Sequence, residues 1–366
     1  MATAFLYSNS TNSSEFVIVR DWKSLYFVLS QLAPFSLAVD RYATPLWCVI
    51  GVLGNLISAR IWTLRRMRKC NTSASYLATL ALSDCLFLVL LVGNELQYPW
   101  MVGVLDLQGW CQIWNVLQIM CQYISVLLVF AFTVERFISV CRPFSCEKFS
   151  KRSRWSKIIS AILCISAVLA MPQAFFWNVS PDIGECAVRR SFNSIYVVWN
   201  WTSDLVMFGA VPIVVFLLNL CVLKQIRTVG KLYVTSDKLY RHAGPRCTST
   251  TATLMWISFY LIFSKLPVTI MFTMQSSVQF GDNMSLDAMK RDVTWQNYLN
   301  YFTARKIIEE LGISHHACNI FIYATTSKQF QSHLKALMVH TFKRKGMVPR
   351  SSPTPVRTRQ CVQPKP

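Results

Sequence analysis

Apolar residues are concentrated in seven runs, and each run is long enough to cross a lipid bilayer as one helix. A helix rises about 1.5 Å per residue, so a hydrocarbon core of about 30 Å requires about 20 residues. Short polar and basic segments separate the runs, a pattern typical of spanning helices. The sequence therefore predicts an all-α membrane protein with a seven-transmembrane helix bundle over residues 43–326. The predicted spans are 43–64, 74–98, 111–140, 156–177, 196–226, 250–276 and 298–325.

The seventh run differs from the others because polar side chains interrupt it. Charged residues inside a span usually face the bundle interior or water, and they often mark a functional site. We expect Arg305 and Lys306 to lie near the outer surface and to extend to water, whereas Glu309 and Glu310 face the interior. The interrupting residues are Arg305, Lys306, Glu309, Glu310, His315 and His316.

Three further segments flank the predicted bundle. Residues 1–42 precede it and are predicted to be an extracellular segment. Basic and apolar residues alternate at helical spacing over 327–340, which predicts a short amphipathic eighth helix on the membrane surface. Residues 341–366 are rich in Pro, Arg and Ser, and we predict a disordered cytoplasmic tail.

Composition supports a membrane protein and argues against a nucleic-acid partner. The chain of 366 residues is 53% hydrophobic and only 15% charged, whereas soluble domains carry about 25% charged residues. The net charge of +20 is concentrated at every second junction between the apolar runs. That placement is the positive-inside pattern of cytoplasmic loops. The bilayer is therefore the partner that the charge indicates.

Acceptor sites for N-glycosylation give the same orientation. They fall in the N-terminal segment and at the junctions poor in basic residues, and such sites are used only on the lumenal side. The N-terminus is therefore predicted to lie outside a plasma membrane and the C-terminus inside. Asn9, Asn12 and Asn178 are the predicted glycosylation sites, and Asn200 and Asn283 fit the same pattern.

Most of the thirteen cysteines lie within apolar runs, where cysteine behaves as a small hydrophobic residue. Cys111 and Cys186 are the two that both fall at extracellular positions. They are the candidates for a disulfide bond.

Ordered motifs along residues 45–340 resemble those of the rhodopsin-like G protein-coupled receptors. Cys111 opens the third run, and Glu135-Arg136-Phe137 closes it with the family's spacing of 25 positions between Cys111 and Arg136. Asn319-Ile320-Phe321-Ile322-Tyr323 is similar to the family's Asn-Pro-x-x-Tyr segment. The other landmarks are Gly54-Asn55, Leu80-Ala81-Leu82-Ser83-Asp84, Pro172, Pro212, Pro267 and Phe330.

The resemblance implies two functional clusters inside the bundle. Asp84 is a carboxylate at mid-membrane depth that requires a partner, a proton or an ion. In the family, this position with Asn55, Ser125 and Asn319 often holds sodium, and a purely structural polar cluster is the alternative. The resemblance also implies a coupling switch that contacts a G protein. Its predicted residues are Glu135, Arg136, Asn319 and Tyr323.

Several family residues are replaced in this chain. Lys265 stands where the sixth helix usually has tryptophan, Leu220 replaces a tyrosine, and Ile320 replaces a proline. These changes put the usual activation mechanism in doubt and indicate a divergent branch, most similar to invertebrate neuropeptide receptors. Because a buried lysine requires an anion, we expect Lys265 to face Asp84 directly or through water. Glu309 is the alternative partner.

The family's ligand-facing positions carry polar and acidic residues here. Gln118 stands where aminergic receptors have aspartate, which disfavours a biogenic amine. Carboxylates beside aromatic rings suit a guanidinium group. Alternatively, some acids pair with Lys265, Arg305 or Lys306 and do not contact ligand. The predicted ligand-binding set is Glu95, Asn115, Gln118, Gln122, Trp201, Asp204, Phe272, Gln275 and Glu309.

The resulting prediction is a receptor that binds an extracellular ligand and signals to a heterotrimeric G protein. The predicted ligand is a short neuropeptide, and an amidated peptide that contains Arg fits the acidic set best. The alternative is a non-signalling decoy or scavenger receptor, which the replaced motifs favour; a transporter or channel comes third. No nucleophile–base pair and no metal-ligand constellation is evident in the sequence, so we predict no enzyme activity, cofactor or metal.

Overall fold

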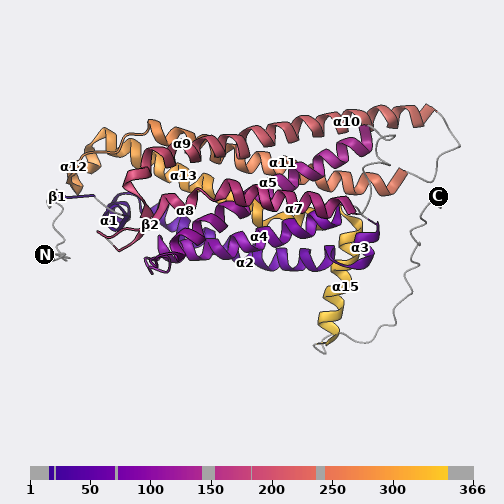
Figure 1. Cartoon of the computed structure of the whole chain (residues 1–366), viewed down its shortest axis with the longest axis horizontal. Helices are drawn as coiled ribbons and strands as arrows, with labels where there is room; N and C mark the ends of the chain where they lie inside the picture. Colours follow the sequence, from indigo (N-terminus) through magenta and orange to yellow (C-terminus); the bar gives the residue numbers. More distant parts are fainter. Residues whose placement is uncertain are drawn as a thin grey trace.

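The computed structural model describes residues 16–19, 22–70, 73–141, 153–182, 184–235 and 244–344. The long helices lie side by side along a common axis, with β1, α1 and α12 at one end and α15 at the other (Figure 1). Within the described ranges, six helical segments are long and apolar enough to cross a membrane. These stretches are Pro34–Trp62 (α2), Ala74–Gln97 (α4), Trp110–Cys141 (α5), Trp155–Phe176 within α7 (Ser153–Ala170) and α8 (Gln173–Phe176), Asn193–Thr228 within α9 and α10, and Thr253–Met274 within α11.

The seventh span is present but is much more polar than the other six. It consists of α13 (Val293–Ala317) and α14 (Asn319–Thr326), which meet at Cys318. α13 packs against α2 and α11. The predicted seven-helix bundle is therefore confirmed, and the seventh helix begins at Val293 rather than at the predicted residue 298.

The first span begins earlier than the sequence suggests. α2 begins at Pro34, at the favourable first position for proline, whereas the apolar pattern places the boundary at residue 43. Asp40 and Arg41 lower the hydrophobicity of the intervening turns. The helix can continue through these turns because Asp40 is buried and paired with Lys306 of α13 at 2.9 Å.

An N-terminal helix covers the extracellular end of α2 and α13. α1 (Trp22–Leu32) packs against α2 and α12 (Leu286–Arg291) through Val28, Leu29 and Met289, which are fully buried. β1 (Phe16–Val17) pairs antiparallel with β4 (Met284–Ser285), which precedes α12. Part of the segment predicted as residues 1–42 is thus ordered structure.

The second extracellular loop contains an antiparallel hairpin. β2 (Trp177–Val179) pairs with β3 (Cys186–Val188), and Val179 lies opposite Cys186. The short 3-10 helix η1 (Arg190–Phe192) then leads to α9 (Asn193–Asp204). The hairpin contacts α5 through β2.

Two irregularities mark the fifth and sixth spans. A π-helical turn, η2 (Leu205–Ala210), separates α9 from α10 (Val211–Thr235), directly before Pro212. Proline lacks a backbone N–H, which favours such local widening. α11 (Gly244–Met274) contains Pro267 in its interior and continues into η3 (Gln275–Ser277).

Close approach of α2 to its neighbours depends on glycine. A Cβ at Gly51 would contact Leu88 of α4 and would lie 2.9 Å from the Cβ of Ala317. A Cβ at Gly54 would lie 2.8 Å from Cγ2 of Ile320. Glycine at these two positions therefore brings α2 against α4, α13 and α14.

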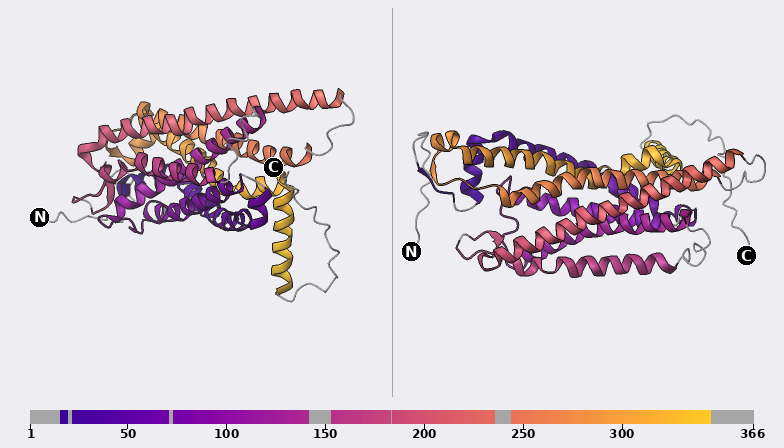
Figure 2. Two further views of the ribbon diagram at one scale, coloured as in Figure 1. Left: turned by 45° about the vertical axis from the view of Figure 1, so that its right-hand side comes forward. Right: turned by 90° about the horizontal axis from the view of Figure 1, so that it is seen from above.

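The cytoplasmic end is formed by α3 (Arg65–Cys70) and α15 (Lys328–Arg344). α15 leaves the bundle at a steep angle (Figure 2), and its first turn is anchored by the fully buried Phe330. This helix is the predicted amphipathic helix, and it extends beyond the predicted end at residue 340. Partial burial and the nearby Arg66 lower the pKa of His333. Residues 345–366 lie outside the described ranges.

Candidate functional site: an outer pocket above a polar core

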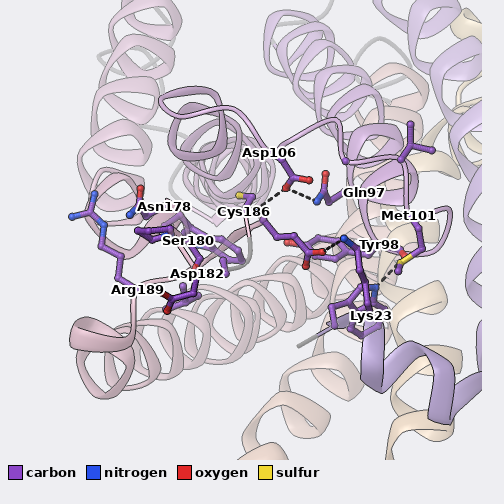
Figure 3. Close-up of a pocket in the computed structure, with 18 of the residues that line it drawn as sticks. Lys23, Gln97, Tyr98, Met101, Asp106, Asn178, Ser180, Asp182, Cys186 and Arg189 are labelled. Carbon is purple, nitrogen blue, oxygen red and sulfur yellow. Dashed lines mark hydrogen bonds and ion pairs between the residues drawn. The ribbon is translucent and has the colours of Figure 1, made fainter. Parts of the chain in front are cut away.

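A pocket of about 720 Å³ opens at the extracellular end of the bundle (Figure 3). Its walls come from three separate segments: the start of α1, the loop after α4, and the β2–β3 hairpin. Aromatic and aliphatic side chains share the lining with charged ones. The lining includes Trp22, Lys23, Gln97, Tyr98, Asp106 and Glu185.

Asp106 connects the β2–β3 hairpin to the extracellular end of α4. Its Oδ1 accepts hydrogen bonds from Gln97 Nε2 and from the backbone N–H of Cys186, both at 2.8 Å. Gln97 Oε1 in turn accepts from the N–H of Leu105 at 2.8 Å. The predicted disulfide between Cys111 and Cys186 is present, so the hairpin is also tied to α5.

α1 closes one side of the pocket. Trp22 donates from Nε1 to the carbonyl oxygen of Tyr98 at 3.0 Å, and its ring contacts the Tyr98 ring edge-on. Lys23 forms an ion pair with Glu185 of the hairpin loop at 2.5 Å. The N-terminal helix therefore links the α2 side of the bundle to the second extracellular loop. The apolar pattern gave no indication of this pocket, because its residues lie in turns and in the segment before the first predicted span.

Two of the three predicted ligand residues of α5, Gln118 and Asn115, are held by polar contacts within the bundle. Gln118 Oε1 accepts from Asn94 Nδ2 at 2.6 Å, and Asn94 Oδ1 accepts from Trp114 Nε1 at 3.0 Å. Asn115 donates to the Cys111 carbonyl at 2.9 Å and lies 3.8 Å from the Cys186 sulfur. Gln122 is half-buried on the same helix. Asn115 is thus the predicted residue that reaches the disulfide beneath the hairpin.

Three other predicted ligand residues surround an internal guanidinium, that of Arg305. Arg305 donates from Nε to Glu309 at 2.7 Å and from Nη1 to Gln275 at 3.1 Å. Its guanidinium also lies 4.5 Å from the centroid of the Phe272 ring. Lys306 adds an ion pair to Glu309 at 3.3 Å. Glu309 is therefore neutralised by two cations of its own helix. This agrees with the alternative stated above, in which some of the acidic residues pair with Arg305 or Lys306.

The remaining predicted ligand residues lie in different settings. Trp201 is 44% exposed on α9, whereas Asp204 at the end of that helix is half-buried. Glu95, near the extracellular end of α4, is buried.

A chain of polar groups crosses the middle of the bundle. His316 Nδ1 lies 2.7 Å from Asp84 Oδ1, and Asn319 donates from Nδ2 to Asp84 Oδ2 at 2.8 Å. Lys265 Nζ lies 3.0 Å from His316 Nε2 on the other edge of the ring. Asn55 donates from Nδ2 to the His316 carbonyl at 2.7 Å. The structure thus places an imidazole between the lysine and the aspartate.

This arrangement corrects the expected partner of Lys265. A direct contact with Asp84 is wrong, because His316 occupies the space between them. Glu309 as the alternative is also wrong, since its described partners are Arg305 and Lys306. Ser125 is fully buried near Asp84, and its membership of a functional polar core stays a prediction. In the sequence, His316 is recognisable only as one of the polar residues that interrupt the seventh run.

The predicted coupling residues lie at the cytoplasmic side. Arg136 donates from Nη2 to Ser73 Oγ at 2.7 Å, at the beginning of α4, and Glu135 precedes it on α5. Tyr323 is fully buried, with its ring 5.4 Å from Trp62 and 5.3 Å from Phe330. These contacts join α5 to α4 and α14 to α2 and α15.

The predicted glycosylation sites are only partly visible. Asn9 and Asn12 lie outside the described residues. Asn178 lies in β2 opposite Ala187 and lines the outer pocket. Glycosylation at these sites stays a prediction.

Residues 55–331 match the family described as 7 transmembrane receptor (rhodopsin family). The chain is 36% identical to the rat neurotensin receptor type 1 over 147 residues, 37% of this chain and 33% of that receptor. It is 32% identical to the Drosophila melanogaster pyrokinin-1 receptor over 146 residues, 39% of this chain and 34% of that receptor. It is 29% identical to the rabbit growth hormone secretagogue receptor type 1 over 203 residues, 50% of this chain and 53% of that receptor.

The matches therefore cover about a third of the length of the neurotensin and pyrokinin receptors.

Proposed function

Because the chain belongs to the rhodopsin family of seven-transmembrane receptors, we propose that it binds an extracellular peptide and signals to a heterotrimeric G protein. The relatives include receptors named for neurotensin, pyrokinin and motilin. The observation that carries the peptide proposal is the outer pocket of about 720 Å³ between α1, the first extracellular loop and the β2–β3 hairpin. Ligand pockets of this size accommodate several side chains.

The peptide would enter this pocket and extend toward the polar face of α5. Asn115 lies next to the disulfide below the hairpin, and Gln118 and Gln122 follow one and two turns deeper along the same helix. Trp201 and Asp204 of α9 would contact the peptide from the opposite side. Glu309, Gln275 and Phe272 would act through Arg305, which they hold in position.

The charge that the ligand should carry depends on which carboxylates of the predicted set are not already paired with a cation of the protein. Glu309 already receives Arg305 and Lys306, so it contributes little to the recognition of a second guanidinium. Of the other two carboxylates in the predicted set, Glu95 is buried and Asp204 is half-buried, so Asp204 is the more accessible partner for a positively charged group of the ligand. An amidated peptide with one basic residue remains our preferred ligand.

Signalling would proceed through the cytoplasmic ends of α5 and α14. Ligand binding shifts a two-state helix bundle, and the inner face then engages the G protein. Arg136, bonded to Ser73 in this structure, is the residue that we propose to change partner. Glu135, Asn319 and Tyr323 complete the proposed switch.

A non-signalling binder is the second candidate, because Lys265 and His316 connect α11 to α13 across the bundle. Outward movement of α11 would require that contact to break. A library of synthetic amidated peptides, applied to cells expressing the chain, tests the first proposal. We expect at least one peptide to stimulate nucleotide exchange on a purified G protein, and Arg136→Ala to abolish exchange while retaining binding. If a peptide binds but stimulates nucleotide exchange on none of the G protein subtypes, the chain is a non-signalling decoy receptor.

A further inference from the structure

Two buried carboxyl groups meet at one hydroxyl between α2, α4 and α13. Glu95 of α4 and Glu310 of α13 are each 8% exposed. Thr44 of α2 donates from Oγ1 to Glu310 Oε1 at 2.6 Å. Glu95 lies on the other side, close enough for its carboxyl to interact with the same hydroxyl. The second oxygen, Oε2, of both glutamates has no hydrogen-bond partner among the described residues.

The neighbouring cations are already assigned to other acids. α13 contributes Lys306, which pairs with Asp40 of α2 at 2.9 Å and with Glu309 at 3.3 Å. Arg305 pairs with Glu309 at 2.7 Å. Among the described residues, the other titratable group near both glutamates is the thiol of Cys48 on α2, which donates to the Leu88 carbonyl. Four carboxyls therefore stand against two cations, and Glu95 and Glu310 are the two without an ion pair in the described structure.

A count of protons shows what the pair requires. A threonine hydroxyl has one hydrogen to donate, and Thr44 cannot donate it to both glutamates at once. If both were ionised, one would be a buried carboxylate without a donor or a counter-ion, which is a costly arrangement. One added proton removes the difficulty, because one carboxyl then donates to Thr44 and the other accepts from it.

We infer that Glu95, Thr44 and Glu310 form a proton-binding site in which the two carboxyls share one proton. The bound proton makes a continuous hydrogen-bonded bridge from α4 through α2 to α13. Its loss places two anions around one hydroxyl and favours separation of α4 from α13. Gln97, two residues after Glu95, lines the outer pocket, so this bridge lies just beneath the extracellular opening. The site makes the outer half of the bundle sensitive to extracellular pH, independently of which peptide binds.

Infrared spectroscopy of the purified full-length chain tests the bridge directly. A protonated carboxyl has a carbonyl stretch that is separate from that of carboxylates and shifts in heavy water. At neutral pH we expect one such band in the wild type to be absent from both Glu95→Gln and Glu310→Gln. In each variant an amide N–H replaces the acid proton, and the remaining glutamate is ionised. Glu309→Gln is the matched control on the same helix, and it should retain the band.

Thermal unfolding in detergent supplies a second, independent readout. The folded pair holds a proton that the unfolded carboxyls release at neutral pH, so stability falls as pH rises. The melting temperature of the wild type should decrease with rising pH more steeply than that of Glu95→Gln or Glu310→Gln. A carboxylic-acid band that persists in either of these two variants, or a pH slope unchanged in both, would overturn the shared proton.

Discussion

Lys265 Nζ lies 3.0 Å from Nε2 of His316, and the opposite ring nitrogen of that histidine lies 2.7 Å from Asp84. All three side chains are buried. The imidazole of His316 therefore lies between the lysine and the central carboxylate. It connects Lys265 of α11 to Asp84 of α4 through polar contacts. The resemblance to the receptor family predicts a sodium site at this carboxylate, and we expect the Lys265 side chain to supply the positive charge there instead.

Replacing this internal cation should destabilise the bundle and create a need for an external one. Lys265→Met leaves Asp84 without the positive charge, and breaking a buried charge pair costs about 3–5 kcal/mol. We expect a lower melting temperature in detergent, with partial recovery when sodium chloride replaces choline chloride. The wild type should show little difference between these salts.

The double variant Lys265→Met with Asp84→Asn is the control for this prediction, because it removes both charges. It should be more stable than Lys265→Met alone and indifferent to sodium. Unchanged expression, signalling and sodium response in Lys265→Met would show that the lysine does not serve Asp84.

The Arg305–Glu309 pair should show measurable coupling despite its position near the extracellular surface. Both side chains are about four-fifths buried, at 23% and 19% exposure, so solvent screens the pair less than an exposed one. A double-mutant cycle with Arg305→Met and Glu309→Gln should give a coupling free energy of about 1–2 kcal/mol. The matched cycle of Arg305→Met with Gln275→Ala should give a smaller value. Coupling below about 0.5 kcal/mol would mean that Lys306 alone neutralises Glu309.

The fold was largely predictable from the sequence, whereas much of the site was not. Apolar runs of bilayer length and the basic junctions predicted seven helices and their orientation, because membrane insertion depends mainly on those two properties. Asp40 illustrates the limit at a boundary: its charge ends the apolar pattern, yet Lys306, distant in sequence, neutralises it inside the bundle. No local pattern contains that information.

Pairing inside the bundle was the other gap. The sequence identified Asp84 and Lys265 as partners for each other's charge but gave no reason to place His316 between them. The i, i+4 spacing of Arg305 and Glu309 was a usable signal, since such residues share a helix face. The outer pocket depends on α1 and on turns, which have no periodic pattern to reveal them.

Loss of the disulfide should destabilise the extracellular side substantially. Cys111 and Cys186 are 75 residues apart, and closing a loop of that length restricts the unfolded chain by about 4 kcal/mol in the chain-entropy description. The double variant Cys111→Ala with Cys186→Ala should therefore melt well below the wild type and reach the cell surface poorly. Cys164→Ala, at an exposed free cysteine, should behave like the wild type. Equal melting of the two variants would contradict the prediction.

Trp22 and Lys23 both attach α1 to the pocket wall, but they should contribute unequally to stability. The Trp22 side chain is packed against other rings, whereas the Lys23 side chain is exposed to solvent. Trp22 combines an indole hydrogen bond to the Tyr98 carbonyl with ring contacts to Tyr98 and Tyr26. Truncating it to alanine should lower the free energy of unfolding by about 2 kcal/mol. The Lys23 side chain is 61% exposed, so Lys23→Ala should cost less than about 1 kcal/mol in spite of its ion pair with Glu185. Melting curves of the two variants at low and high salt provide the measurement, and only the small effect of Lys23→Ala should vanish in high salt. A larger loss for Lys23→Ala than for Trp22→Ala would show that the ion pair, rather than aromatic packing, holds α1 over the pocket.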